Sequence, residues 1–487
     1  MPQPPTVESL YEQGNASLRC NRFDEAIGAY REALLHRPLY PEAQVNIGAA
    51  LQGLGRLDEA RAAYEAALAI QPEFPHALNN LATILRRQHR TEEAIAACRR
   101  ALALRPAYPA ALNNLGMALQ DSGEYDAAIA AFREALTLLP GKMTYLNNLA
   151  VVVKDAGRID ESIAILRLAL TLHPDSPETR WNLGIALLMS GGLEHGWPQY
   201  ERRWDVPGLQ EARRHASVPA WDGRELHGKR ILLWAEQGLG DTVQFVRYAG
   251  LVAQRGGRVV LQVQPELKQL LQGLPAVEAL VTTDDPSPDV DVQCPLLSLG
   301  LIMGTTLATI PAAVPYLSAD PRRVERWRVR LAAETGHLNV GLVWAGRSTH
   351  INDGNRSMPL AALAPLSQVP QARFFSLQKG KAAEQAPPAG LSLTDWTHEL
   401  IDLADTAAFV SSLDLILTVD TSIAHLAGAL GKRTLLLLPF APDWRWMLGR
   451  CDSPWYPTMR LFRQPRFGDW GSVVNELVEG QLLRSPA

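Results

Sequence analysis

Small and bulky apolar residues recur at a fixed spacing through residues 7–204 of the chain. One small position repeats every 34 residues, at Gly14, Gly48, Ala82, Gly116, Ala150 and Gly184. A second small position is followed by a bulkier one, in the pairs Ala26 and Tyr30, Ala60 and Tyr64, Ala94 and Cys98, Ala128 and Phe132, and Ser162 and Leu166. Prolines keep the same period, at Pro38, Pro72, Pro106, Pro140 and Pro174. Small side chains let two helices approach closely, larger ones fill the gaps between pairs, and proline ends the second helix. The pattern therefore predicts stacked helix pairs.

A helix–turn–helix unit with a 34-residue period is the signature of the tetratricopeptide repeat (TPR). We expect an all-α TPR solenoid of about six repeats over residues 1–204, with repeats that begin at Val7, Pro41, Pro75, Pro109, Met143 and Pro177. The sixth repeat departs from the pattern, because Gly196 and Arg203 stand where alanines are expected. Such a departure is typical of a terminal repeat that packs on another domain.

An asparagine recurs at one position of the first helix in successive repeats, at Asn46, Asn80, Asn114, Asn148 and Asn182. Asparagine is a mediocre residue for a helix interior, so helix propensity does not explain the recurrence. These amides could cap or bridge neighbouring helices. They could also form a ladder on the concave face that binds the backbone of an extended peptide. The second interpretation is favoured by a resemblance to the asparagine ladder in the repeats of eukaryotic O-GlcNAc transferase. Each such bond contributes only about 0.5–1.5 kcal/mol, which suits transient, sequence-tolerant capture.

The hydrophobic pattern changes after a polar connector at residues 205–228. Short apolar runs predict strands at residues 231–234, 258–263, 277–282, 340–346, 373–377, 415–419 and 434–438. Helices are expected between them at residues 242–253, 403–413 and 423–430. Strands that alternate with helices predict parallel sheets. We therefore expect two Rossmann-like domains, at residues 229–335 and 336–487, with a ligand cleft between them at the carboxyl ends of their strands.

Three loops that follow predicted strands carry candidate chemistry. The first contains Gly238, Gly240 and Asp241, where glycines permit a tight turn before a helix N-terminus that favours an anion. The second, residues 346–357, is dense in polar groups that suit a phosphate or a sugar, although an ordinary solvated loop would look similar. In the third, Asp420, Thr421, Ser422 and His425 open a helix whose free amides and hydroxyls could seat a diphosphate. A tight strand-to-helix turn, a helix cap and a structural histidine are the plainer interpretations of the first and third loops.

Composition and charge indicate an ordinary soluble protein. Hydrophobic residues make up 47% of the 487 residues and charged residues 20%, as in ordinary soluble proteins. A formal net charge of −4 gives no reason to expect nucleic acid. No signal peptide is visible, and no apolar run reaches the roughly 20 residues that span a bilayer. The four cysteines form no CxxC pair. A cytoplasmic protein without disulfides or a membrane span is expected.

Gly240 and Asp241 after the first strand, together with Asp420, Thr421, Ser422 and His425 at the start of a late helix, resemble glycosyltransferase family 9, the heptosyltransferase-like family, whose fold is GT-B. The similarity covers residues 229–470 and is most specific at residues 420–431, although the family usually has glycine where Ser422 stands. Bacterial proteins that join TPR repeats to such a domain resemble the whole chain, including residues 236–241 and 443–446. The resemblance implies that Asp241 is the catalytic base. It also implies that Thr421, Ser422 and His425 hold a nucleotide diphosphate and that a cation, Arg356 or Lys379, assists the leaving phosphate.

The resulting hypothesis is a metal-independent, inverting glycosyltransferase with a nucleotide-sugar donor, no further cofactor, and a protein acceptor held by the TPR arm. Helix amides, hydroxyls and a cation would stabilise the leaving diphosphate, and the carboxylate would deprotonate the acceptor hydroxyl. Asp289 and Asp291 match the DxD pattern of metal-dependent glycosyltransferases, but their context indicates a structural strand and turn, so no metal is expected. Two alternatives stay open: a glycan or lipid-linked acceptor with the repeats as a scaffold, or an inactive TPR adaptor.

Overall fold

The structure is a computed structural model that describes residues 5–209, 213–332, 337–350 and 352–480. Contacts divide the chain into two compact units, Met1–Pro174 and Asp175–Ala487. The sequence-based boundary between two Rossmann-like domains, at residues 335 and 336, lies outside the described residues. No helix in the described residues is long and apolar enough to cross a membrane.

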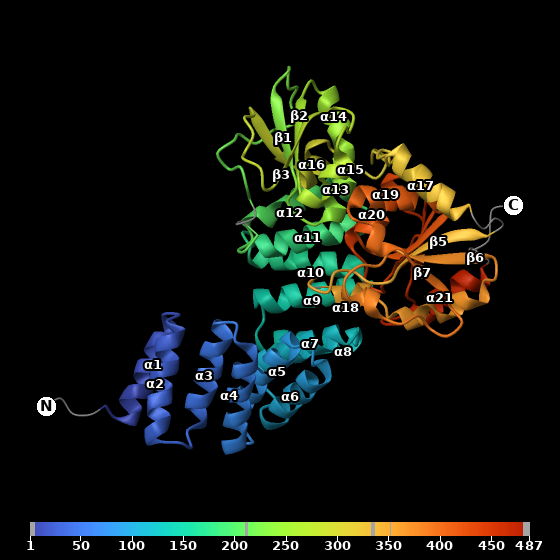
Figure 1. Cartoon of the computed structure of the whole chain (residues 1–487). Helices are drawn as coiled ribbons and strands as arrows, with labels where there is room; N and C mark the ends of the chain where they lie inside the picture. Colours follow the sequence, from blue (N-terminus) through green and yellow to red (C-terminus); the bar gives the residue numbers. More distant parts are fainter. Residues whose placement is uncertain (1–4, 210–212, 333–336, 351, 481–487) are drawn as a thin grey trace. The chain divides into compact units, whose positions relative to one another are not determined.

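The first unit consists of antiparallel helix pairs (Figure 1). The pairs are α1 (Val7–Arg19) and α2 (Phe23–His36), α3 (Pro41–Gly53) and α4 (Leu57–Ile70), α5 (Pro75–Arg87) and α6 (Thr91–Leu104), α7 (Pro109–Asp121) and α8 (Tyr125–Leu138), and α9 (Met143–Asp155) and α10 (Ile159–Leu172). The expected repeat starts coincide with the first residue of each leading helix, so this part of the prediction is confirmed. Proline opens α3, α5 and α7, where its fixed φ suits the first helical turn and its missing N–H costs nothing.

Within each pair, a small residue on the first helix faces a larger residue on the second. A Cβ added to Gly116 would lie 2.8 Å from the ring of Phe132, and one added to Gly48 would lie 2.6 Å from Tyr64. Where the larger position carries Cys98 or Leu166, the small position carries alanine instead of glycine. The volumes therefore compensate from one repeat to the next, as close packing requires.

The second unit begins with the sixth helix pair, α11 (Pro177–Met189) and α12 (Leu193–Tyr200), followed by a 3₁₀ turn, η1 (Glu201–Asp205). It continues into a four-stranded parallel sheet with strand order β3-β2-β1-β4. The strands are β1 (Arg230–Trp234), β2 (Arg258–Val263), β3 (Val277–Thr282) and β4 (Val292–Pro295). We call this sheet and the helices that pack on it the first lobe.

A six-stranded parallel sheet follows, with order β10-β9-β8-β5-β6-β7. Its strands are β5 (Leu338–Val343), β6 (Ala372–Ser376), β7 (Leu393–Asp395), β8 (Leu415–Val419), β9 (Thr434–Leu438) and β10 (Met459–Arg463). The order is that of a Rossmann sheet, with the reversal of direction between β5 and β8. We call this sheet and its helices, among them α18 (Asp353–Arg356), α19 (Leu403–Ser412), α20 (Ser422–Ala429) and α21 (Trp470–Glu479), the second lobe. The α/β class expected after the repeats is thus confirmed.

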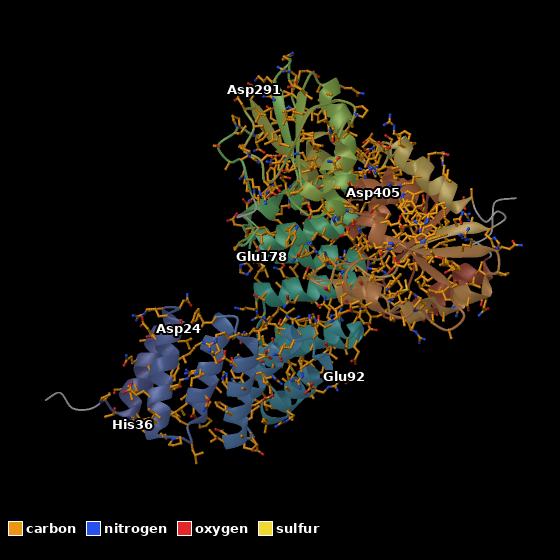
Figure 2. All side chains as sticks on the ribbon, viewed as in Figure 1. Asp24, His36, Glu92, Glu178, Asp291 and Asp405 are labelled. Atoms are coloured by element: carbon orange, nitrogen blue, oxygen red, sulfur yellow. The ribbon has the colours of Figure 1, made fainter. Side chains whose placement is uncertain are left out.

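One helix that precedes the expected domain boundary belongs to the second lobe. Helix α17 (Pro321–Leu331) packs against α19, which carries Asp405 (Figure 2). Asp405 accepts from Arg323 at 2.9 Å and from Arg326 at 3.3 Å. The chain therefore enters the second lobe before β5 begins.

Two expected elements have different bounds in the structure. The helix expected at residues 242–253 is interrupted: α13 (Leu239–Phe245) and α14 (Ala249–Gln254) flank a 3₁₀ turn, η3 (Val246–Tyr248). The strand expected to reach residue 346 ends at Val343, because the N–H groups of Trp344 and Ala345 donate to Gln378 Oε1, at 3.1 and 2.9 Å, instead of to a neighbouring strand.

Candidate functional site

The three loops singled out by sequence lie at the carboxyl ends of parallel strands. Residues 344–357 follow β5 and residues 420–422 follow β8, the two strands between which the second sheet reverses direction. This is the position where ligands bind in open α/β sheets. Residues 236–241 follow β1 of the first sheet. Helices α13 and α20, which begin at the first and third loops, pack against each other. The two lobes therefore meet at their loops.

Gly240 shows how closely the first loop approaches the second lobe. A Cβ at this position would lie 2.8 Å from His425 Cδ2 and 3.5 Å from the Cα of Ser422. Glycine is therefore required here by the approach of α20. Gly238, by contrast, is the N-cap residue of α13 with φ −70°, a conformation that other residues adopt.

Asp241 is the third residue of α13, with Gly238 as the N-cap, and not itself the cap. Its Oδ2 accepts the N–H of Gly238 at 2.9 Å, and its Oδ1 accepts from Nη2 of Arg445 in the second lobe. The side chain of Asp241 is 19% exposed.

The third loop has the form of a capped helix N-terminus. Thr421 is the N-cap of α20, and its Oγ1 accepts the N–H of Ile423 at 3.3 Å, while Ser422 is the first helical residue. Both are half-buried. Asp420 lies directly before them, where burial, together with the carboxylate of Asp443, raises its pKa to about 6.

His425 is enclosed between aromatic rings. Its Nδ1 lies 2.9 Å from Tyr456 Oη, and its ring stacks on Trp446 with centroids 5.3 Å apart. Burial, followed by the positive charge of Arg445, lowers its pKa to about 3. The imidazole is therefore neutral at physiological pH. In this environment it can serve as a neutral hydrogen-bonding group and not as a cation.

Of the two candidate cations, Arg356 lies at the site. The pKa of His350 is lowered by burial and then by the positive charge of Arg356, and the carboxylate of Asp241 acts on the same imidazole. Arg356 and Asp241 are therefore both close to His350. The guanidinium is 3.6 Å from Asp353, and its Nε is buried without a hydrogen-bond partner among the described residues. Lys379 is exposed and donates from Nζ to the carbonyl of Leu400, so nothing in the described contacts brings it to this position.

Arg445 is the residue that sequence reasoning missed. It lies in the 3₁₀ turn η9 (Trp444–Trp446) after β9, with 8% of its side chain exposed. Besides its contact with Asp241, Nη1 donates to Asp443 Oδ1 at 2.8 Å and Nε donates to Gln244 Oε1 at 2.7 Å. The available signal was a lone cation between two tryptophans after an apolar strand, because so enclosed a charge needs a partner.

The sixth helix pair packs against both lobes beside these loops. The indole of Trp197 donates to Thr305 O at 2.9 Å and meets the rings of Phe245 and Trp444 edge-on. In η1, Arg203 forms a bidentate ion pair with Glu236, at 3.0 and 2.9 Å, at the start of the first loop.

Three of the five recurring asparagines donate hydrogen bonds to the preceding repeat. Asn114 Nδ2 donates to Asn79 Oδ1 at 2.8 Å, and Asn148 Nδ2 donates to Asn113 Oδ1 at 2.9 Å. Asn46 Nδ2 donates to Asn15 Oδ1 at 2.9 Å. The bridging role is therefore present. The recurring asparagines, Asn46, Asn80, Asn114, Asn148 and Asn182, are all half-buried.

The DxD sequence has a structural place at the edge of the first sheet (Figure 2). Asp291 Oδ2 accepts the N–H of Arg230 at 2.8 Å, and the carbonyl of Asp289 accepts from the Arg230 guanidinium at 2.6 Å. No group of three or more histidine, cysteine or acidic residues suited to hold a metal occurs in the described part of the chain.

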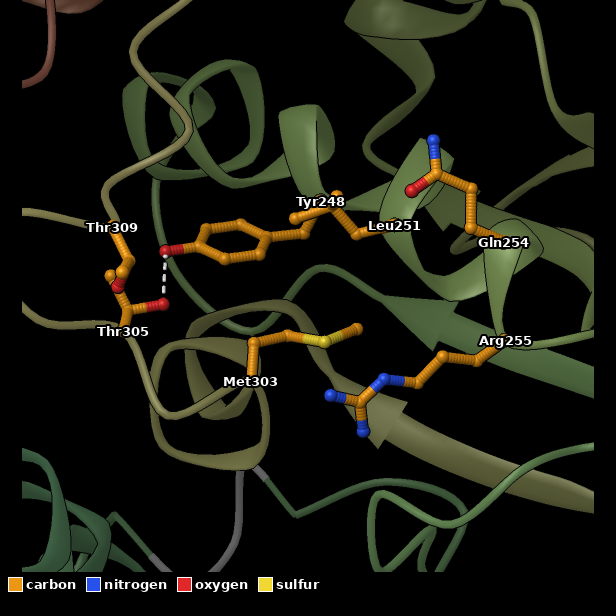
Figure 3. A pocket seen from close by; sticks show the side chains of 7 residues that line it. All are labelled: Tyr248, Leu251, Gln254, Arg255, Met303, Thr305 and Thr309. Atoms are coloured by element: carbon orange, nitrogen blue, oxygen red, sulfur yellow. Dashed lines mark hydrogen bonds between the residues drawn. The ribbon is translucent and has the colours of Figure 1, made fainter.

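A pocket of about 270 Å³ occurs elsewhere in the first lobe (Figure 3). It is lined by Tyr248, Leu251, Gln254, Arg255, Met303, Thr305 and Thr309. Tyr248 and Thr305 close one side through a 2.9 Å hydrogen bond between their hydroxyls. None of the predicted site residues lines it, so the chemistry-bearing residues and this pocket are separate features.

Comparison with known proteins supports the repeats directly. One tetratricopeptide repeat family model matches residues 73–140 and another matches residues 11–75 and 113–177. The chain is 28% identical over 317 residues to Protein FlbA of Caulobacter vibrioides, which covers 60% of this chain and 52% of the relative. The chain thus spans about half the length of this curated relative.

Solved structures also match the chain over part of its length. The crystal structure of MamA is 23% identical, with a TM-score of 0.31, and covers 34% of this chain and 92% of that chain. The structure of TTC0263, a thermophilic TPR protein in Thermus thermophilus, is 25% identical, with a TM-score of 0.33, and covers 38% of this chain and 100% of that chain. The presence of TPR repeats from residue 11 to residue 177 rests on the family models.

Proposed function

We propose that the chain is a metal-independent, inverting glycosyltransferase of GT-B type that acts on a protein hydroxyl held by the TPR repeats. The observation that carries the proposal is the meeting of the two lobes at their loops. A carboxylate, Asp241, stands beside a capped helix N-terminus at Thr421 and Ser422, with a cation, Arg356, at the same edge. A base on one side and an anion seat on the other are the two parts that this reaction needs.

In the proposed reaction, Asp241 takes the proton of the acceptor hydroxyl as its oxygen bonds to the anomeric carbon of the donor. The bond between that carbon and the diphosphate oxygen breaks, and the nucleoside diphosphate departs with the electron pair. The α20 N-terminus and Arg356 stabilise the charge that develops on the leaving group. Neutral His425 can donate or accept one hydrogen bond there. Attack opposite to the leaving group inverts the anomeric centre.

The acceptor side of the proposal rests on the repeats. TPR repeats are protein-interaction modules, and the half-buried asparagines offer amide groups at a regular spacing. Nδ2 of Asn46 donates to both Tyr11 and Asn15, and Nδ2 of Asn114 donates to both Asn79 and Thr83, so the oxygens of these two amides are the groups left to bind a peptide. An extended peptide would meet them with its main-chain N–H groups.

The test is intact-mass analysis of candidate acceptor proteins incubated with the full chain and a panel of nucleotide sugars. We expect a mass increase of one sugar residue with the wild-type chain and none with Asp241→Asn. Asp452→Asn is a matched control, since Asp452 also pairs with an arginine, Arg450 at 2.7 Å, but is 68% exposed. Full transfer by Asp241→Asn would remove Asp241 as the base.

A second candidate is a protein adaptor without transfer chemistry. The match of TPR models to residues 11–177 favours it, because TPR repeats are protein-interaction modules. An adaptor would capture the same proteins equally well with and without nucleotide sugar and leave their masses unchanged. That result, combined with no binding of any nucleoside diphosphate, would replace the transferase proposal.

A further inference from the structure

We propose that Arg445 is a diphosphate-binding residue and that it exchanges Asp241 for the diphosphate when the donor binds. The inference rests on the proposed function, and it adds a residue and an order of events to it. Before the donor binds, the carboxylate is held by Arg445. After the donor binds, the carboxylate oxygen is released to an acceptor hydroxyl.

The geometry of the guanidinium sets up this exchange. Arg445 is fixed within the second lobe by Asp443 Oδ1, which accepts from Nη1 at 2.8 Å and from the main-chain N–H at 3.0 Å. Its contact with Asp241 instead crosses to the first lobe through Nη2. Loss of the second contact therefore leaves the arginine in place. The ring of Trp444, 4.3 Å from the guanidinium carbon, provides a further fixed support.

Arg445 stands beside the predicted diphosphate seat. The next residue, Trp446, stacks on His425, which lies in the first turn of α20. The positive charge of Arg445 also acts on the pKa values of Asp420 and His425, on either side of Thr421 and Ser422. An anion at the N-terminus of α20 would therefore enter the field of this arginine.

Unused hydrogen-bonding capacity lies at the same point. A guanidinium has five N–H groups, and the side-chain contacts with Asp241, Asp443 and Gln244 use three of them. Gln244 is fully buried, and its Nε2 has no partner among the described residues. Buried N–H donors without acceptors are costly, and a ligand rich in oxygen would satisfy them.

Asp241 and the diphosphate compete for Arg445 because both are negatively charged. A carboxylate carries one negative charge, whereas a nucleoside diphosphate carries at least two, so the diphosphate is the stronger partner for a buried cation. Asp241 also opposes diphosphate binding, because it occupies Arg445 and repels a second anion. Asp241 makes no favourable contact with the diphosphate in this scheme. Removal of its charge should therefore tighten diphosphate binding. If Asp241 acted only as a base and did not compete for Arg445, its substitution would leave the affinity for the diphosphate unchanged.

The experiment is isothermal titration of the full chain with ADP, GDP, UDP, CDP and dTDP, followed by the variants with the nucleotide that binds. Asp241→Asn should bind roughly fivefold more tightly or better, in the range of a coupling between sites. Asp241→Ala, which lacks the amide, should change affinity in the same direction. Arg445→Gln should bind roughly tenfold more weakly or worse, and Asp452→Asn should match the wild type.

The outcomes separate this inference from the proposed function. A wild-type chain that binds none of the five nucleotides overturns the proposed function and this inference with it. A wild-type chain that binds one of them, together with Asp241 variants that bind no more tightly, overturns the exchange and leaves the proposed function standing. Circular dichroism of each variant confirms that it is folded. If Arg445→Gln is not folded, the sign of the change in the Asp241 variants decides alone.

Discussion

The volume compensation inside the helix pairs can be tested at Gly116. In Gly116→Ala the new methyl would lie 2.8 Å from the ring of Phe132, which is fully buried. Carbon atoms pack at about 3.5–4.0 Å, so the overlap is near 1 Å. Overpacking of this kind costs about 1–3 kcal/mol. Alanine has a higher helix propensity than glycine, which stabilises α7 by about 1 kcal/mol, so the net decrease in the free energy of unfolding is about 0–2 kcal/mol.

The chain itself contains the compensated combination. Ala150 and Leu166 occupy the same two positions in the fifth repeat, and both are fully buried or nearly so. Phe132→Leu alone should be destabilising because it leaves a cavity beside Gly116. The double variant Gly116→Ala with Phe132→Leu should be more stable than the sum of the two single changes predicts, by about 1–2 kcal/mol, since the methyl fills that cavity.

Hydrogen-exchange mass spectrometry of the full chain measures the local opening free energy of α7 and α8 in each variant. Gly28→Ala is the matched control, since Gly28 lies within α2 and a Cβ there would meet no atom within 4 Å. It should be stabilising by about 1 kcal/mol through helix propensity alone. Effects of the two changes at Gly116 and Phe132 that add to within about 0.5 kcal/mol would refute the packing argument.

Three further predictions concern stability. Arg203→Ala should cost about 3–5 kcal/mol in thermal unfolding of the full chain, because it leaves Glu236 buried and unpaired. Arg202→Ala should cost less than about 1 kcal/mol, since the Arg202 side chain is 51% exposed, and similar losses for the two variants would contradict the argument. The pKa of Asp420 is raised from 3.8 to about 6, so the folded state holds its proton to higher pH than the unfolded state. The wild type should therefore lose stability relative to Asp420→Asn as the pH rises from about 4 to about 6. A difference in melting temperature between the two proteins that does not change over this pH range would refute the argument. Asn114→Ala should increase hydrogen exchange in α5 and α7, because Asn114 donates to both Asn79 and Thr83, at 2.8 and 3.1 Å, and unchanged exchange would remove the bridging role.

Local patterns determine how much of the fold could be predicted. The prolines mark the starts of α3, α5 and α7 because proline at the first helical position costs no hydrogen bond. The expected strands at residues 258–263, 277–282, 415–419 and 434–438 coincide with β2, β3, β8 and β9, since each is a short run of mainly apolar residues. The short β7 was missed because three residues are too few to show a period.

The site could be predicted only where it depends on one loop. The turns at Gly240 and Thr421 follow from a strand that leads into a helix. The pairing of Asp241 with Arg445 joins residues 204 apart, so no local pattern records it. The choice between Arg356 and Lys379 likewise depends on where two loops point after the sheet forms. Contacts that arise from the docking of two lobes are absent from the spacing of residues along the chain.

The position of the sixth helix pair has an evolutionary consequence. Trp197 and Arg203 contribute to the interior of the same unit that carries Asp241 and Arg445, so this pair cannot be exchanged as part of a separate module. Recombination that adds, deletes or replaces repeats before Pro174 leaves those contacts intact. The length and surface of the arm are therefore free to diversify between lineages, while the pair that joins the two lobes is inherited with them.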